Sequence, residues 1–332
     1  MSTIPVLYHA ESSFYSQKAR LALAEKGVAY KSRLVNLIMG EVHELWYLRT
    51  VNPHGTVPAM EHKGTLYTDS ADIIDYVDTL PSSRPKLCPP GDSDEAVRAR
   101  HFRQLLDPIE IDIISYGAIF NRHLTKNSRV PNFMSVDQMK AKMAKSAQDL
   151  EEIKQKHPDL ALPLTNRRNL VSFTDTASNE VAFLKILDVC DKALAEVETA
   201  LEDRKAEFDN EEYWLCGRNF TAADIQLACI LHRLVFVGLA ERVFISKRPH
   251  MSAYYQRVLC RTTFRRECVY ANSLFWSMAM PMARGMLKKA RPFIFTLSLF
   301  AAVGAYAYHF HRATLREYAI AFLDKFTYIP TS

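Results

Sequence analysis

The sequence predicts an α+β fold with a sheet-containing domain over residues 1–80, a linker over 81–92 and an all-helical domain over 93–270. Two patterns predict this division: strand-like and helix-like segments alternate as far as residue 80, and after Pro90 every apolar periodicity has helical spacing. A third pattern, an apolar segment over residues 292–311, predicts a C-terminal transmembrane helix.

The composition excludes several classes of protein. The chain has 332 residues, 48% of them apolar and 24% charged, which is unlike a disordered chain and allows two ordinary domains. The net charge of +5 is too weak to indicate nucleic-acid binding. The six cysteines lie far apart without Cys-x-x-Cys or paired histidine spacing, so we expect reduced thiols and no metal site. Residues 1–5 lead directly into an apolar strand, so we expect no cleaved targeting segment there.

The first domain begins with a predicted strand over Val6–Tyr8 and a helix over Ser16–Lys26. We expect Ser16 to be the N-cap of that helix and Gly27 to end it. An extended run follows over Val28–Leu37. These segments form a predicted βαβ unit.

A second unit follows a variable region over Glu41–Arg49. Short strands are expected over Val57–Met60 and Gly64–Tyr67. A helix over Ser70–Leu80 places its apolar residues on one face, and Pro81 stops it. The unit is therefore ββα, and the two units together predict a small sheet with helices packed on it.

One long helix of the second domain has an apolar stripe spaced 4, 3, 4, 3, 4, formed by Phe183, Leu187, Cys190, Leu194, Val197 and Leu201. The stripe could be a coiled-coil seam, but fewer than three heptads favour a helix packed in a bundle. Further on, Thr221 and Asp224 have the spacing of a capping box, which predicts a structural helix cap. His232 beside Cys229 is compatible with a metal ligand or with a core histidine.

Residues 124–179 form a polar, lysine-rich region that we interpret as an insertion on the surface of the bundle. It contains a predicted helix over Ser135–Lys156 and a predicted loop through His157, Pro158 and Pro163. Basic residues in or near it predict contact with acidic lipid or a protein partner, or else a solvated face. They are Arg122, Lys126, Arg129, Arg167 and Arg168.

The C-terminal segment predicts a tail anchor. Residues 293–308 contain no formal charge, and the segment extends to about nineteen residues if Pro292, His309 and Phe310 are included. A helix of sixteen to nineteen residues spans roughly 24–29 Å at about 1.5 Å per residue. Residues 271–291 form a basic amphipathic linker before it, and a short tail over 312–332 follows. A buried core helix is the alternative. An anchor here leaves the bulk of the chain facing the cytosol.

Four motifs carry a resemblance to a known family. They are Ser13-Phe14-Tyr15-Ser16, Asn52-Pro53-His54-Gly55-Thr56-Val57-Pro58, Asp69-Ser70-Ala71-Asp72-Ile73-Ile74-Asp75-Tyr76 and Phe220-Thr221-Ala222-Ala223-Asp224. Together they resemble the glutathione transferase family, whose N-terminal domain is thioredoxin-like. The whole layout, with its insertion and C-terminal anchor, resembles the ganglioside-induced differentiation-associated protein 1 family. This resemblance implies a homodimer in the outer mitochondrial membrane, with peroxisomal membranes as a further location.

The resemblance also implies catalytic residues. Ser13 takes the position at which serine-type transferases donate a hydroxyl hydrogen bond to the glutathione sulfur and favour its thiolate. Tyr8 takes the position of the catalytic hydroxyl in tyrosine-type members, with packing as the alternative. Phe14 and Tyr15 stand where active serine-type relatives commonly have small residues or cysteine, which implies weak or absent transferase chemistry.

Four residues are implied to bind glutathione. Val57 and Pro58 occupy the cis-proline position of the fold, where the backbone of Val57 pairs with the ligand. Ser70 begins a helix and is implied to bind the γ-glutamyl carboxylate, or else to act as a plain N-cap. Asp69 is implied to contact the amine of glutathione.

Two hypotheses of function follow. In the first, the protein is a membrane-tethered organiser that regulates mitochondrial fission and redox homeostasis, with protein partners bound through residues 124–179. In the second, it is an active membrane-bound glutathione transferase in which Ser13 activates the thiol against hydrophobic electrophiles. Neither hypothesis includes a metal or nucleic acid.

Overall fold

The computed structural model describes residues 4–37, 39–130, 135–166, 168–209 and 211–269. Its N-terminal domain contains a four-stranded sheet in the order β2-β1-β3-β4. The strands are β1 (Val6–His9), β2 (Lys31–Leu34), β3 (Ala59–His62) and β4 (Thr65–Tyr67). Strand β1 runs parallel to β2 and antiparallel to β3, and β3 runs antiparallel to β4. The predicted βαβ and ββα units are thus confirmed.

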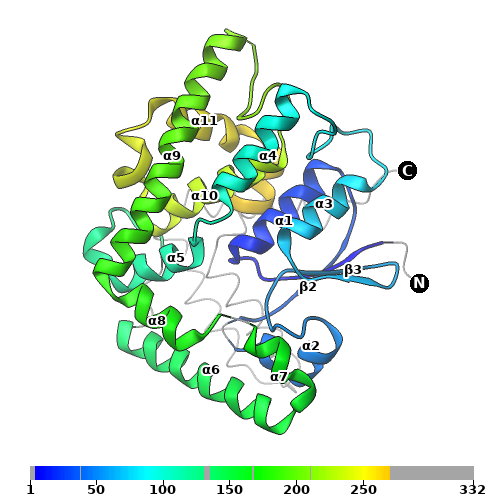
Figure 1. Ribbon diagram of the computed structural model, residues 1–332, viewed down its shortest axis with the longest axis vertical. Coiled ribbons are helices and arrows are strands. Elements are labelled where there is room, and N and C mark those ends of the chain that lie inside the picture. The colour runs from blue at the N-terminus through cyan, green and yellow to red at the C-terminus, as the bar shows by residue number, and fades with distance from the viewer. Residues whose placement is uncertain (1–3, 38, 131–134, 167, 210, 270–332) are drawn as a thin grey trace, which may run out of the picture.

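Helices cover both faces of this sheet (Figure 1). Helices α1 (Phe14–Glu25) and α3 (Ser70–Thr79) pack on one face, where their apolar residues meet Leu7 and Met60. Helix α2 (Leu45–Thr50) lies on the opposite face, where Tyr47 packs against Ala59. Because side chains alternate along a strand, neighbouring strand residues supply the two cores.

The second domain is helical throughout its described part. Its main helices are α4 (Asp94–Leu106), α5 (Ile111–Phe120), α9 (Glu180–Phe208), α10 (Ala222–Val237) and α11 (Pro249–Cys260). Shorter helical elements are η1 (Glu41–His43) in the first domain and η2 (Arg122–Leu124), η3 (Glu241–Ile245), α12 (Thr262–Phe264) and η4 (Arg265–Val269) in the second. The six residues of the apolar stripe are all buried on one face of α9, which confirms a helix packed in a bundle.

Helix α10 lies at the centre of the bundle, packed against α1, α4 and α5. Its predicted cap is present: the Asp224 carboxylate accepts hydrogen bonds from the Thr221 amide (2.9 Å) and the Thr221 hydroxyl (2.8 Å). It also accepts from the Leu215 amide (2.9 Å) and the Tyr254 hydroxyl (3.0 Å). This one buried carboxylate therefore joins α10 to α11 and to the loop before α10.

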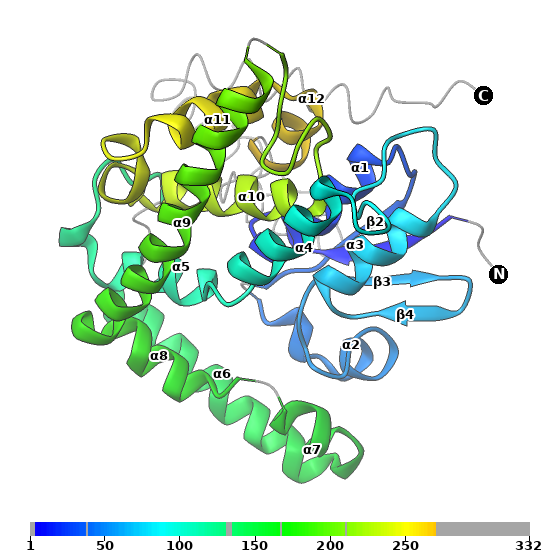
Figure 2. The ribbon, with the colours of Figure 1, turned by 45° about the horizontal axis from the view of Figure 1, so that its top comes forward.

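The insertion is a layer of three helices, α6 (Val136–Lys156), α7 (Pro158–Thr165) and α8 (Leu170–Ser178) (Figures 1 and 2). The helix predicted over Ser135–Lys156 is confirmed, and Ser135 caps it. The loop predicted through Pro158 and Pro163 is wrong, because both prolines lie within α7. Pro158 stands in the first turn, where a backbone N–H has no intrahelical partner, so a proline is tolerated there.

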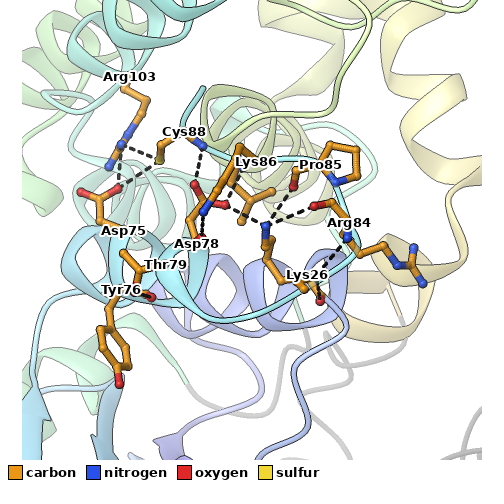
Figure 3. Close-up of polar contacts among 12 residues, drawn as sticks. Lys26, Asp75, Tyr76, Asp78, Thr79, Arg84, Pro85, Lys86, Cys88 and Arg103 are labelled. Carbon is orange, nitrogen blue, oxygen red and sulfur yellow. Dashed lines mark hydrogen bonds and ion pairs between the residues drawn. The ribbon is translucent and has the colours of Figure 1, made fainter. Parts of the chain in front are cut away.

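A polar network at the linker joins the two domains (Figure 3). Asp78 of α3 forms an ion pair with Lys26 (3.1 Å) and accepts the backbone amides of Leu87 (2.8 Å) and Cys88 (3.1 Å). Arg103 of α4 reaches across to Asp75 of α3 (2.8 Å). The orientation of α3 relative to α4 is therefore held by several polar contacts.

The C-terminal expectations fall mostly outside the described residues. Within the described part of the chain, no helix has the length and apolar character needed to cross a bilayer. The anchor predicted over residues 292–311, the linker over 271–291 and the tail over 312–332 lie outside the described residues.

Candidate functional site

The loop between β1 and α1 carries the predicted catalytic serine. Ser13 has an extended backbone (φ −73°, ψ 125°), and its hydroxyl oxygen accepts the Ser16 amide at 3.3 Å. Ser13 is therefore the N-cap of α1, and the expectation that Ser16 caps this helix is wrong. Ser16 instead lies buried in the first turn, where its hydroxyl oxygen accepts the Ala10 amide at 3.3 Å.

The Ser13 hydroxyl can donate a hydrogen bond to an anionic ligand. Capping uses a lone pair of the hydroxyl oxygen, so the hydroxyl proton stays available for donation to a thiolate. The N-terminus of a helix also favours negative charge. Tyr8, the alternative catalytic residue, is half-buried against the cluster between the sheet and α2.

The loop before β3 holds the expected cis proline. The Val57–Pro58 peptide bond is cis, as predicted. The loop is fixed by hydrogen bonds to the Thr56 carbonyl from the Tyr47 hydroxyl (2.7 Å) and the Asn52 side-chain amide (3.0 Å). Its backbone is therefore anchored to α2 on the side away from α1.

The start of α3 separates the roles of two neighbouring residues. The Asp69 carboxylate accepts the Ala71 amide at 2.7 Å, so Asp69 is the N-cap. Ser70 is the first helical residue and is 3% exposed. The plain N-cap role left open for Ser70 thus belongs to Asp69, and Ser70 stands where the free amides of the first turn favour a carboxylate.

Two aromatic residues, Phe14 and Tyr15, follow Ser13 at the start of α1. The Phe14 ring is buried in the core of the helical domain, whereas Tyr15 is 37% exposed. Their ring centroids lie 5.2 Å apart in an edge-to-face arrangement. Burial raises the pKa of Tyr15, with a further contribution from Asp112, so its phenol stays protonated.

Two arginines hold the loop before Ser13, and the sequence reasoning missed both. Arg20 of α1 donates to the carbonyls of Ala10 (3.2 Å) and Glu11 (3.1 Å). Arg233 of α10 donates to the Ser12 carbonyl (2.6 Å). The signal that could have indicated them is a basic residue inside an otherwise apolar helix, because a charged side chain is rarely buried unless it is paired or hydrogen-bonded.

The neighbour of Arg233 is a core histidine. His232 pairs through Nδ1 with the Tyr255 hydroxyl at 2.7 Å, and burial lowers its pKa to about 3. Among the residues that the structure describes, no cluster of three or more histidine, cysteine or acidic side chains could hold a metal ion.

The insertion reaches the cis-proline loop from the other side. The imidazole of His54 contacts the Pro163 carbonyl of α7 at 3.1 Å, and Arg49 of α2 pairs with Asp159 of α7 at 3.1 Å. Beneath these polar contacts, apolar residues of the two segments pack together, namely Leu48, Leu150, Leu160 and Leu164. We call this contact between α2 and the α6–α7 segment the clasp. It was not expected from the sequence, where the insertion was placed only on the bundle surface.

Comparisons with known proteins agree with this fold. Residues 7–85 match the model of the glutathione S-transferase N-terminal domain, and residues 167–257 match that of its C-terminal domain. The human and mouse proteins described as ganglioside-induced differentiation-associated protein 1-like 1 are each 32% identical over 91% of this chain and 84% of their own length. Glutathione S-transferase TCHQD of Arabidopsis thaliana is 28% identical over 78% of this chain and 88% of its own length.

Solved structures share the fold at lower identity. The β-etherase LigF of a Sphingobium strain has a TM-score of 0.56 and 22% identity, over 80% of this chain and 98% of its own. A theta-class glutathione S-transferase of Xanthomonas axonopodis with glutathione bound has a TM-score of 0.52 and 17% identity, over 82% of this chain and 100% of its own. Both similarities concern the fold alone.

Proposed function

Because the chain belongs to the glutathione S-transferase family, alongside ganglioside-induced differentiation-associated protein 1-like 1, we propose that it is a glutathione-binding protein. It is anchored in the outer mitochondrial membrane by residues 292–311, with its bulk facing the cytosol. There it regulates mitochondrial fission and redox homeostasis, with weak or no transferase chemistry. It acts as a homodimer and binds protein partners through residues 124–179, and a share of it resides in peroxisomal membranes.

One observation carries the glutathione proposal: three separate segments each present a group suited to one part of the tripeptide. Ser13 offers a hydroxyl proton at the N-terminus of α1, which suits the sulfur. The cis Val57–Pro58 segment suits pairing with an extended peptide backbone. Ser70 and the first-turn amides of α3 suit a carboxylate.

The two residues that follow Ser13 support the proposal of weak or absent transferase activity. A thiolate poised for attack needs an electrophile to approach it directly. Phe14 and Tyr15 follow the serine directly in the sequence; the Phe14 ring is packed into the core of the helical domain, and the exposed Tyr15 ring lies against it edge to face. We propose that the large Tyr15 side chain, in place of a small residue, hinders the approach of an electrophile to a sulfur held by Ser13.

The membrane part of the proposal is supported by the sequence of residues 293–308, which contain no formal charge and are flanked by basic residues. Its test is removal of residues 292–332. We expect the shortened protein to leave the membrane fraction and to lose its effect on mitochondrial shape. Replacing the segment with an unrelated outer-membrane anchor should restore both. An unchanged effect without any anchor would contradict the proposal.

The glutathione part is tested by calorimetry on the full chain in mild detergent. Ser70→Ala should weaken glutathione binding by at least about tenfold, because a hydrogen bond to a charged group is worth roughly 1.5–3 kcal/mol. Ser172→Ala is the matched control, since Ser172 is an exposed serine on α8. A folded wild-type protein that gives no heat with millimolar glutathione would refute glutathione binding.

An active transferase is the second candidate, favoured by the unshared hydroxyl proton of Ser13 at a helix N-terminus. Under this alternative, Ser13 activates the thiol against hydrophobic electrophiles from the bilayer. Ser13→Ala should then abolish turnover while leaving glutathione affinity within a few-fold. If wild type and Ser13→Ala both show near-zero turnover, the transferase alternative is refuted and the membrane-tethered organiser remains.

A further inference from the structure

Two cysteines from distant parts of the chain meet between helix α10 and the helical turn η4. The sulfur atoms of Cys229 in α10 and Cys268 in η4 lie 4.0 Å apart, and both residues are fully buried free thiols. A disulfide joins two sulfur atoms at about 2.05 Å, so the pair lacks an approach of about 2 Å. Thiols at this separation are in position to form a bond when an oxidant accepts their electrons.

Helix α10, which carries the first cysteine, also holds the loop before Ser13. Arg233 lies four residues after Cys229, one turn further along α10. Its guanidinium donates to the Ser12 carbonyl at 2.6 Å. A shift of this part of α10 is therefore transmitted to the backbone next to Ser13.

The turn η4, which carries the second cysteine, holds the same loop through Arg20. Glu267 precedes Cys268, and its carbonyl accepts a hydrogen bond from Arg20 at 2.8 Å. The Glu267 carboxylate also lies 3.6 Å from Nε of Arg20. The same guanidinium donates to the carbonyls of Ala10 (3.2 Å) and Glu11 (3.1 Å). The two cysteines thus belong to two elements that grip one loop from different sides.

Access of an oxidant to the pair depends on η4. This element is a single turn of five residues, Arg265–Val269, and a helix so short is not stable without its packing on α1 and α10. Burial raises the pKa of the Cys268 thiol, so it stays protonated and unreactive while η4 is docked. Local opening of η4 exposes the thiols, and docking then brings the two sulfurs together.

We propose that Cys229 and Cys268 are a redox site, oxidised to an intramolecular disulfide by a small disulfide such as glutathione disulfide, and that this bond steadies the loop before Ser13. A reversible disulfide of this kind is the redox-sensing form found in reducing compartments. The site lies outside the proposed glutathione site and does not depend on it.

The reaction is a two-step thiol–disulfide exchange. The thiolate of one cysteine attacks glutathione disulfide, which forms a mixed disulfide and releases one glutathione. The thiolate of the other cysteine then attacks the protein sulfur of the mixed disulfide and releases the second glutathione. The protein loses two electrons and two protons, and both appear in the two glutathione thiols.

The first experiment maps the bond. The full chain in mild detergent is equilibrated in glutathione buffers of increasing disulfide content, the remaining thiols are trapped by alkylation, and the peptides are identified by mass spectrometry. Peptides with Cys229 and Cys268 should become linked, and excess reduced glutathione should separate them. Cys229→Val and Cys268→Val should each abolish the link while keeping an apolar side chain in the core. Cys190→Val is the matched control, because Cys190 is a fully buried cysteine of α9, and the link should persist in it.

The second experiment measures hydrogen exchange in the oxidised and the reduced wild type. Oxidation should slow exchange over residues 10–14 and 265–269 by at least about fivefold, because the cross-link opposes opening of η4. Exchange in α6 should not change. Cys229→Val treated with the same buffers should show no difference in these segments.

The inference is overturned if the folded wild type does not link Cys229 to Cys268, or if the linked protein exchanges over residues 10–14 as fast as the reduced one. Calorimetry with reduced glutathione distinguishes this site from the proposed function. A protein that forms the link but does not bind glutathione would refute the proposed function and support the redox site. A protein that binds glutathione without forming the link would overturn the redox site alone.

Discussion

The clasp between the insertion and α2 can be tested within a single helix. Helix α7 contains three leucines at alternate positions, of which Leu160 and Leu164 are each 4% exposed and Leu162 is 71% exposed. The two buried leucines pack against Leu48 of α2 and against α6. Truncating each leucine to alanine therefore compares buried and exposed positions with the same chemistry and the same helix propensity.

Burial sets the expected magnitudes. Truncation of a buried leucine costs about 2–5 kcal/mol, and we expect about 2–3 kcal/mol here because the cluster contains only a few side chains. Leu162→Ala should cost less than about 0.5 kcal/mol, as exposed substitutions do. The Arg49–Asp159 ion pair adds little, because both side chains are about half exposed.

Hydrogen exchange at α2 and the cis-proline loop is the assay that links the clasp to the site. Leu160→Ala and Leu164→Ala should each speed exchange over residues 45–58, because α7 supports this segment through Leu48 and His54. Exchange in α10 should not change. Equal effects of Leu160→Ala and Leu162→Ala, or unchanged exchange over 45–58 in the buried variants, would show that the insertion does not support the loop.

Three further predictions concern the helical core. Asp224→Ala leaves four buried donor groups without their acceptor and should lower the free energy of unfolding in urea by about 4 kcal/mol; a loss below 1 kcal/mol contradicts the network. Gly117→Ala places a Cβ 2.2 Å from the Phe183 ring and should cost at least about 2 kcal/mol by the same measurement, so a neutral effect argues against this packing of α5 on α9. Burial lowers the pKa of His232 from 6.5 to about 3 in the folded state, so below pH 6.5 this histidine binds a proton in the unfolded chain but stays neutral in the folded one. The free energy of unfolding should therefore fall by about 2 kcal/mol from pH 7.5 to pH 5. His232→Gln should remove this contribution to the pH dependence of stability, and an unchanged pH dependence contradicts the assignment.

The first domain was predictable because its signals are local. Gly27 has φ +65°, a conformation that ends α1 where the sequence placed the end. Short apolar runs indicated the strands, and the family resemblance of the motif around Pro58 implied the cis peptide bond. The one local error concerned Ser16, since two serines three residues apart both suit an N-cap, and only the backbone of Ser13 is extended there.

What the sequence could not predict depends on contacts between distant segments. The clasp joins residues more than a hundred positions apart, such as Arg49 and Asp159, and no local pattern marks such a pair. The same holds for Arg233 and Ser12. Proline usually breaks helices, so Pro158 and Pro163 predict a loop, yet the buried Leu160 and Leu164 hold α7 in place.

Helix α1 joins the parts of the molecule that matter for both folding and ligand binding. Arg20 binds the loop before Ser13 and the carbonyl of Glu267 in η4 (2.8 Å), and Glu25 at its end pairs with Arg261 (2.6 Å). Substitutions at these ion-paired positions will change folding and binding together, because removing one partner leaves the other charge buried.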